Sequence, residues 1–197
     1  FVSSGIKVHN NSKVQSIEKL KTKIKVNIIT ESGSLQIDGN VALLAIGVEG
    51  NINNIGLQDI GVQSKNGSIS INNYCQTNIS NIYAIGDVAG PPWLAHKASA
   101  QGHMVADLIC GKSVHEIDYF NVPNCTYCQP QVASLGLTES KAKDLGHNIK
   151  VGKFFFRASG KAMAVGNTFG FVKLIFDDRY GELIGAHIIG DGATEMI

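Results

Sequence analysis

Gly86 and Asp87 are the residues best placed to do chemistry, because they end the apolar run Ile-Tyr-Ala-Ile of residues 82–85. The pattern predicts a short strand over residues 81–87 with a carboxylate at its carboxyl edge, where open α/β folds bind ligands. Gly86 lets a ligand approach the backbone closely, and the Asp87 carboxylate accepts hydrogen bonds from a sugar or polyol hydroxyl. Since an aspartate at a strand end is common, this pair alone does not establish a ligand site.

A helix over residues 94–109 is expected directly after this strand. Its apolar residues fall largely on one helical face, and Gly111 is suited to end it. The N–H groups of its first turn would point back toward Asp87 and favour negative charge there by roughly 0.3–1 kcal/mol. The strand end and the helix start therefore predict one ligand site.

The first quarter of the chain is expected to form strands. Alternation over residues 19–26 predicts a half-buried strand whose lysines make a solvated face rather than a phosphate site. A hairpin turn is expected at residues 31–34. Residues 41–46 are apolar on both faces and, closed by Gly47, predict the central strand of a covered sheet.

The remaining segments predict a loop region followed by a separate α+β unit. Residues 49–80 are rich in Asn, Gly and Ser, and Asn66-Gly67 is a strong turn signal. Thr138 is suited to cap a helix that runs to Leu145 and ends at Gly146. Strands are expected at residues 132–135, 149–156, 171–176 and 183–189, the last two as an antiparallel hairpin.

Composition excludes several classes of protein. Hydrophobic residues make up 44% of the 197, enough for a core and too many for a disordered chain. Charged residues make up only 17%, which predicts buried interfaces. A net charge of +1 argues against a nucleic-acid partner, and no apolar run is long enough to span a membrane. Because the chain opens on Phe1 and stops in mid-pattern, we expect it to be part of a longer protein.

A resemblance to a known family narrows the function. The segment Thr-Asn-Ile-Ser-Asn-Ile-Tyr-Ala-Ile-Gly-Asp at residues 77–87 resembles the second FAD-binding motif of flavoproteins with two dinucleotide-binding domains. Its continuation, with Leu-Ala-His-Lys-Ala at residues 94–98, resembles the dihydrolipoamide dehydrogenase family, the E3 components of 2-oxo-acid dehydrogenase complexes. Similarity continues through Gln-Pro-Gln-Val-Ala at 129–133 and Gly-Ala-His-Ile-Ile-Gly at 185–190, and covers essentially the whole chain.

The resemblance implies FAD and NAD as cofactors. Asp87, after Gly86, matches the aspartate that holds the FAD ribityl chain, and the helix start would face the flavin pyrimidine. The segment whose backbone lies under the flavin is matched by Trp93, Leu94, Ala95 and His96, although the family usually has Met where Trp93 stands. Gly47 matches a glycine at the NAD site. The family often has Gly-Arg there, so Gly47-Val48 leaves the choice between NAD and NADP open.

The implied fold is α/β and α+β, in three parts. Residues 1–50 would be the end of an NAD-binding domain, 51–118 a central FAD-contacting domain, and 119–197 an interface domain, incomplete at its C-terminus, that forms a homodimer. The implied partner is dihydrolipoamide on the lipoyl domains of a 2-oxo-acid dehydrogenase complex. Fifteen lysines against two arginines favour an A+T-rich bacterial genome, so we expect a bacterial cytoplasmic location, or the mitochondrial matrix in a eukaryote.

Three features that carry the family's reaction are missing from this sequence. It has no G-x-G-x-x-G, no C-x4-C redox pair, and no His-Pro segment with the acid–base histidine. We therefore expect the parent protein to oxidise dihydrolipoamide and reduce NAD⁺, and this chain to be inactive alone. Two alternatives stay open: a sister disulfide reductase of the glutathione or mercuric type, and a non-catalytic dimerisation fragment.

Other reactive side chains have simpler explanations. Cys125 and Cys128 resemble a redox pair or half a zinc site, but in an extended segment residues three apart are separated by roughly 10 Å, too far for a disulfide. His96 is expected to contribute backbone rather than a catalytic side chain. We expect no metal site, a structural role for two further histidines, and surface positions for the rest (His103 and His187; His9, His115 and His147).

Overall fold

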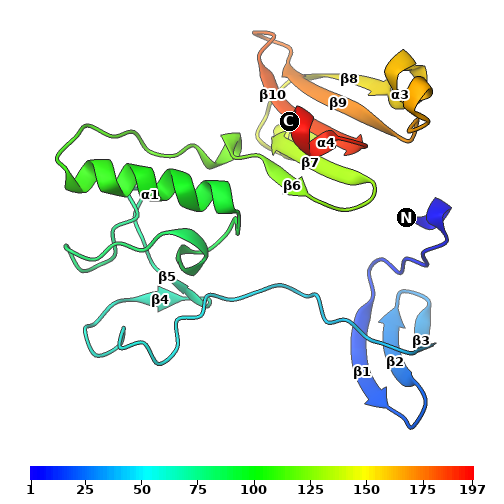
Figure 1. The fold of residues 1–197 in the computed structure, drawn as a ribbon, viewed down its shortest axis with the longest axis horizontal. Coiled ribbons are helices and arrows are strands. Elements are labelled where there is room, and N and C mark those ends of the chain that lie inside the picture. Colours follow the sequence, from blue (N-terminus) through cyan, green and yellow to red (C-terminus); the bar gives the residue numbers. More distant parts are fainter. The chain divides into compact units, whose positions relative to one another are not determined.

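The computed structural model describes the backbone of residues 1–197 and the side chains of all of them except residue 3. It divides into two compact units, Phe1–Val48 and Glu49–Ile197. Figure 1 shows a small antiparallel sheet in the first unit, and one long helix and a five-stranded sheet in the second. No helix within the described residues has the length and apolar character needed to cross a bilayer.

The first unit is a three-stranded antiparallel meander that follows a short 3₁₀ turn, η1 (Val2–Ser4). Its strands are β1 (Lys13–Lys19), β2 (Ile24–Thr30) and β3 (Gly33–Gly39), in the order β1-β2-β3. β-Branched residues favour these strands, and Ile28 at the centre of β2 is buried. The expected hairpin turn joins β2 to β3, where the Thr30 hydroxyl donates to the Gly33 carbonyl at 2.9 Å.

Two strand predictions in this unit are wrong. Residues 19–26 contain the β1–β2 turn, in which the Leu20 N–H donates to the Lys23 carbonyl at 2.8 Å. The alternation continues on both sides of this turn, so it does not reveal it. Residues 41–46 are not a strand, and Val41 and Leu43 are 83% and 88% exposed. A strand forms only where a neighbour supplies its backbone partners, and no described strand pairs with these residues.

The second unit begins with loops around a small hairpin, β4 (Ser64–Lys65) and β5 (Ser68–Ile69). Asn66 and Gly67 form its turn with φ of 52° and 72°, the left-handed pair that a two-residue hairpin requires. The strand expected over residues 81–87 is reduced to one bridge between Tyr83 and Gln76. The chain then enters the 3₁₀ turn η2 (Gly86–Ala89), because Gly86 at φ +75° takes the backbone out of extended geometry.

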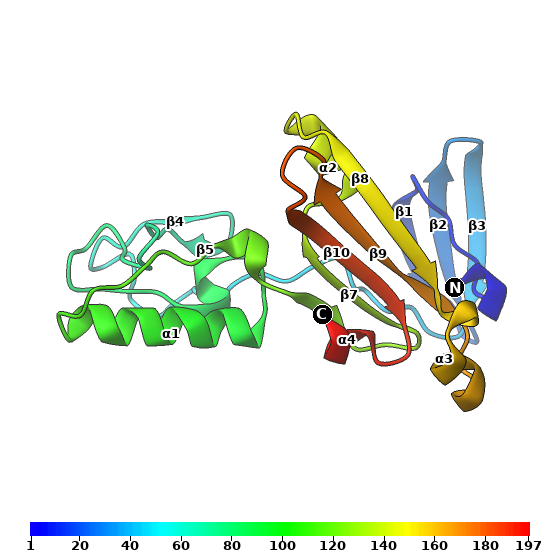
Figure 2. The same ribbon diagram turned by 90° about the horizontal axis from the view of Figure 1, so that it is seen from above.

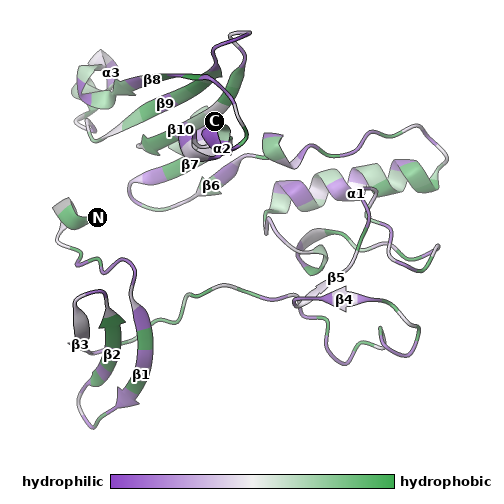
Figure 3. Ribbon diagram, turned by 180° about the vertical axis from the view of Figure 1, so that it is seen from behind, coloured by the Kyte–Doolittle hydropathy of each residue, from purple (hydrophilic) through white to green (hydrophobic). Residues whose placement is uncertain are grey.

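The expected helix is present as α1 (Ala95–Ile109). In Figure 3 it carries both hydrophilic and hydrophobic stretches, as a helix with one buried face should. Met104 and Val105 pack on the fully buried Cys75. Gly111 ends the helix at φ +73°, and its N–H donates to the Leu108 carbonyl at 3.0 Å.

The C-terminal part is a five-stranded antiparallel sheet in the order β6-β7-β10-β9-β8. Figure 2 shows β7, β10, β9 and β8 side by side. The strands are β6 (Asn124–Thr126), β7 (Gln131–Gly136), β8 (Ile149–Phe155), β9 (Gly170–Asp177) and β10 (Leu183–Gly190). Short helices and turns connect them: η3 (Tyr119–Asn121), α2 (Glu139–Asp144), η4 (Phe156–Ala158), α3 (Gly160–Val165) and α4 (Ala193–Met196). The β9–β10 hairpin confirms the sequence prediction, and the core lies where α4 covers β7.

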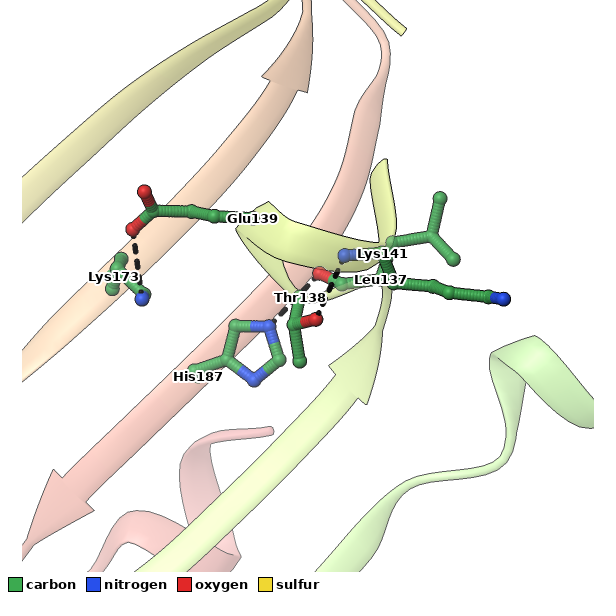
Figure 4. A network of polar contacts seen from close by, with 6 residues as sticks. All are labelled: Leu137, Thr138, Glu139, Lys141, Lys173 and His187. Atoms are coloured by element: carbon green, nitrogen blue, oxygen red, sulfur yellow. Dashed lines mark hydrogen bonds and ion pairs between the residues drawn. The ribbon is translucent and has the colours of Figure 1, made fainter. Parts of the chain in front are cut away.

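A small polar network fixes α2 against the sheet (Figure 4). The Thr138 hydroxyl accepts from the Lys141 N–H at 3.2 Å and so caps the helix as predicted. Lys173 of β9 donates to Glu139 at 2.9 Å, and His187 of β10 contacts the Leu137 carbonyl at 3.0 Å. These contacts hold the β7–α2 connection against β9 and β10.

His147 lies in the loop before β8, as expected, and its side chain is partly exposed and paired with Asp177. Its Nδ1 lies 2.7 Å from an oxygen of Asp177, whose side chain is only 13% exposed. The bond from His147, and then the N–H of Arg179 at 2.8 Å, hold the pKa of Asp177 below its usual value. The pair joins the loop before β8 to the end of β9.

Replacing Asp177 with asparagine is expected to weaken the acid dependence of stability. A carboxyl with a lowered pKa stabilises the fold above its unfolded value, and this contribution is lost as the pH falls through the folded value. Wild type should therefore lose thermal stability more steeply than Asp177→Asn as the pH falls below about 4. Melting curves between about pH 5 and pH 2 test this, and parallel curves for the two proteins would contradict it.

Candidate functional site

The site predicted around Asp87 lies in the turn between the Tyr83 bridge and α1. Gly86 is buried at φ +75°, whereas the Asp87 side chain next to it is exposed. Among the described residues the Asp87 carboxylate has no hydrogen bond or ion pair. The carboxylate is therefore available to a ligand, while the backbone that carries it is buried.

Two buried polar side chains of α1 hold this turn. Lys97 donates to the carbonyls of Gly86 and Gly90, at 2.9 and 3.0 Å. Gln101 accepts from the Gly86 N–H at 2.8 Å and donates to the Tyr119 hydroxyl at 2.9 Å. Both side chains are 1% exposed. The sequence analysis names Lys97 only as part of the Leu-Ala-His-Lys-Ala motif and gives no role to Gln101. Two polar residues four apart on the buried face of a helix could have indicated a buried hydrogen-bonding pair.

The start of α1 forms the second part of the site. Leu94 is its N-cap residue and no side chain caps the helix, so the first N–H groups stay open to a ligand. Gly86 packs close to the helix, since a Cβ built there would meet the Ala98 methyl group at 3.4 Å. Ile85 and Trp93 are each 40% exposed beside this turn. An exposed carboxylate, an open helix start and apolar side chains thus occur together.

The buried ammonium group of Lys97 affects the electrostatics of this turn. Burial lowers the pKa of Lys97, and the negative charge of Asp87 opposes that effect. Burial likewise raises the pKa of the neighbouring Cys75 thiol, which keeps it a protonated core residue. Asp87 and Lys97 therefore interact as opposite charges, one facing solvent and one inside.

The other predicted site residues take different positions. His96 lies on the exposed side of α1, and its Nε2 is 2.7 Å from the Pro123 carbonyl, which connects the helix to the segment before β6. Gly47 is in the first unit at φ +127°, and a Cβ built on it would meet no atom within 4 Å. Leu94 and Ala95, with Trp93 and His96, form the start of α1.

No disulfide joins the cysteines within the described residues. Cys75, Cys110, Cys125 and Cys128 are all free thiols. The Cys128 thiol donates to the Pro130 carbonyl at 3.0 Å, and Cys125 packs against the sheet core. No group of three or more potential metal ligands occurs in the described part of the chain.

Comparison with known protein families identifies the family of this chain. Residues 1–102 match the model of pyridine nucleotide-disulphide oxidoreductases, and residues 122–197 match the dimerisation domain of the same family. The chain is a pyridine nucleotide-disulphide oxidoreductase by family. The resemblance to flavoprotein disulfide reductases inferred from the Asp87 motif, and the mixed α/β and α+β fold that it implied, are thus confirmed.

Relatives of this pyridine nucleotide-disulphide oxidoreductase chain include several dihydrolipoyl dehydrogenases. That of Rhizobium etli is 49% identical over 98% of this chain and 40% of its own length. That of Zymomonas mobilis is 44% identical over 100% of this chain and 43% of its own length. The chain therefore spans about two fifths of the length of these relatives.

Solved structures show the same fold. LpdA of Mycobacterium tuberculosis superposes with a TM-score of 0.87 at 24% identity, over 100% of this chain and 42% of its own. The HOCl-induced flavoprotein disulfide reductase RclA of Escherichia coli gives a TM-score of 0.82 at 23% identity, over 93% of this chain and 42% of its own.

The pyridine nucleotide-disulphide oxidoreductase family implies FAD and NAD(H) as cofactors, in agreement with the sequence resemblance. The residues present fit FAD. The unpartnered Asp87 carboxylate suits a polyol chain, and the exposed Ile85 and Trp93 suit an apolar ring system. The open start of α1 suits a ring that gains negative charge on reduction.

Proposed function

We propose that this chain is part of an FAD- and NAD-dependent dihydrolipoamide dehydrogenase. The observation that carries the proposal is the exposed Asp87 on a turn held by α1, in a chain 49% identical to a dihydrolipoyl dehydrogenase. FAD, when bound, passes electrons from a dithiol to NAD⁺. The dithiol and the acid–base histidine of this reaction are not encoded in these 197 residues.

The residues of the site have separate roles in this proposal. Asp87 accepts hydrogen bonds from the ribityl hydroxyls, and Gly86 permits their close approach. The backbone of residues 93–96 would hold the flavin, and the start of α1 would stabilise negative charge on the reduced ring. Gly47 lines the NAD site from the first unit.

The domain division and the homodimer belong to the same proposal. We assign residues 1–50 to the NAD-binding domain, 51–118 to the central domain and 119–197 to the interface domain. The match to a dimerisation domain over residues 122–197 supports a homodimer. Half-exposed aromatic side chains of this domain, Phe154 at 53% and Phe169 at 55%, are of the kind that such interfaces bury. Dihydrolipoamide on lipoyl domains is the proposed partner.

Two alternatives predict different properties. A sister disulfide reductase would prefer glutathione disulfide or a mercuric ion, and the Leu-Ala-His-Lys motif at residues 94–97 disfavours it. A non-catalytic dimerisation fragment would be a colourless dimer of twice 21.0 kDa. For location we propose the bacterial cytoplasm, or the mitochondrial matrix in a eukaryote, on the lysine-rich composition alone.

The visible absorption spectrum of the purified full-length protein that contains this chain, before and after addition of dihydrolipoamide, tests the proposal. A flavin spectrum that bleaches with dihydrolipoamide and recovers with NAD⁺ is the expected result. A flavin spectrum that bleaches only with NADPH and recovers with glutathione disulfide would favour the sister reductase. A colourless dimer that takes up no added FAD would contradict the proposal and favour the fragment.

A further inference from the structure

We infer that Lys97 and Gln101 are positioning residues for FAD, which act by fixing the Gly86 peptide so that Asp87 meets the ribityl chain. The inference rests on the proposed function and extends it to two side chains that need not touch the cofactor. Both are almost fully buried, and both bond to the same residue.

Gly86 is held on both of its backbone polar groups. Its N–H donates to Gln101 at 2.8 Å, and its carbonyl accepts from Lys97 at 2.9 Å. The two side chains are four residues apart and so lie on one face of α1. With both groups occupied, rotation of the peptide that precedes or follows Gly86 would break a buried hydrogen bond. The direction of the Asp87 side chain is set by these peptides.

Burying the Lys97 ammonium group beside two carbonyls costs free energy, because the group loses its hydration. It bonds to the carbonyls of Gly86 and Gly90, at 2.9 and 3.0 Å, which span the turn that carries Asp87. The negative charge of Asp87 acts on the Lys97 ammonium group and opposes the effect of burial on its pKa. The positive charge can also help to orient the Asp87 carboxylate, which no apolar side chain of equal volume would do.

Gln101 also connects the Gly86 turn to a residue outside it. Its amide donates to the Tyr119 hydroxyl at 2.9 Å, in η3 just before the interface sheet. This outer contact is separable from the inner one, because Tyr119→Phe removes it and leaves the Gly86 contact in place. The chain thus offers an internal control for which of the two bonds matters.

The test is the FAD affinity of the full-length protein that contains this chain, stripped of FAD and titrated with it while flavin fluorescence is followed. Lys97→Met and Gln101→Leu are each expected to weaken binding by at least about tenfold, the effect of losing a hydrogen bond in a buried network. Two controls should stay within roughly threefold of wild type: Tyr119→Phe, and Lys112→Met, which removes an exposed lysine paired with Asp107.

A double-mutant cycle separates positioning from general stability. If Lys97 acts through Asp87, adding Lys97→Met to Asp87→Asn should weaken FAD binding by less than about threefold further, since interacting residues are not additive. Additive losses in the cycle would overturn the inference. Circular dichroism confirms that each variant is folded, and if Lys97→Met does not fold, Gln101→Leu carries the same test on the same peptide.

The outcomes distinguish the inference from the function on which it rests. A wild-type protein without FAD affinity overturns both. A wild-type protein that binds FAD, with folded Lys97→Met and Gln101→Leu variants that bind it equally well, overturns only the positioning role.

Discussion

Gly185→Ala is expected to destabilise the five-stranded sheet by about 3 kcal/mol, a large value for adding one methyl group. A Cβ at this position would overlap the carbonyl oxygen of Leu137 and lie 3.1 Å from its carbon. Leu137 cannot move away, because its N–H donates to the Ile184 carbonyl at 2.8 Å and its carbonyl contacts His187 at 3.0 Å. The added methyl group would clash with backbone atoms of Leu137, which cannot relieve the overlap by changing rotamer.

Gly152→Ala is the matched control. Gly152 lies in β8 of the same sheet, and a Cβ there would meet no atom within 4 Å. Thermal unfolding should show Gly185→Ala melting lower by roughly 6–12 °C and Gly152→Ala close to wild type, and size-exclusion chromatography should show loss of the proposed dimer for Gly185→Ala. Equal melting temperatures for the two variants would refute the argument from the Leu137 carbonyl.

Asp87→Ala is expected to lower FAD affinity by about a hundredfold, with folding unchanged. Hydrogen bonds to a charged group contribute about 1.5–3 kcal/mol each, which corresponds to roughly 10–150-fold in affinity. The carboxylate is exposed and accepts no hydrogen bond from the described residues, so its removal breaks no hydrogen bond and takes from the FAD-free protein only a charge interaction with Lys97. The effect should therefore appear in binding and not in the stability of the FAD-free protein.

FAD titration together with thermal unfolding of the FAD-free protein tests this prediction. Asp107→Ala provides the comparison, since it removes a half-exposed carboxylate at the far end of α1 and an exposed ion pair with Lys112. That variant should bind FAD as wild type does. Unchanged FAD affinity in Asp87→Ala would place the ribityl chain elsewhere and remove the main support for the proposed site.

Sequence patterns were sufficient to predict the elements that depend on contacts between residues close together in the chain. The apolar face predicted α1, the Thr138 cap predicted α2, and Asn66-Gly67 predicted a hairpin. Each depends on contacts within a few residues, so sequence spacing encodes it directly. The Gly-Asp turn and its continuation also identified the family, because that motif combines a backbone requirement with a side chain that a ligand needs.

Only the tertiary structure decided the features that depend on distant partners. Residues 41–46 have strand composition but pair with no described strand, and residues 81–87 are limited to one bridge. The His147–Asp177 pair joins residues 30 apart. Spacing can place Lys97 and Gln101 on the buried face of the helix, but only the fold shows that both bond to Gly86. Strand pairing and buried polar partners are set by which segments meet in space, and short-range sequence patterns carry no record of that.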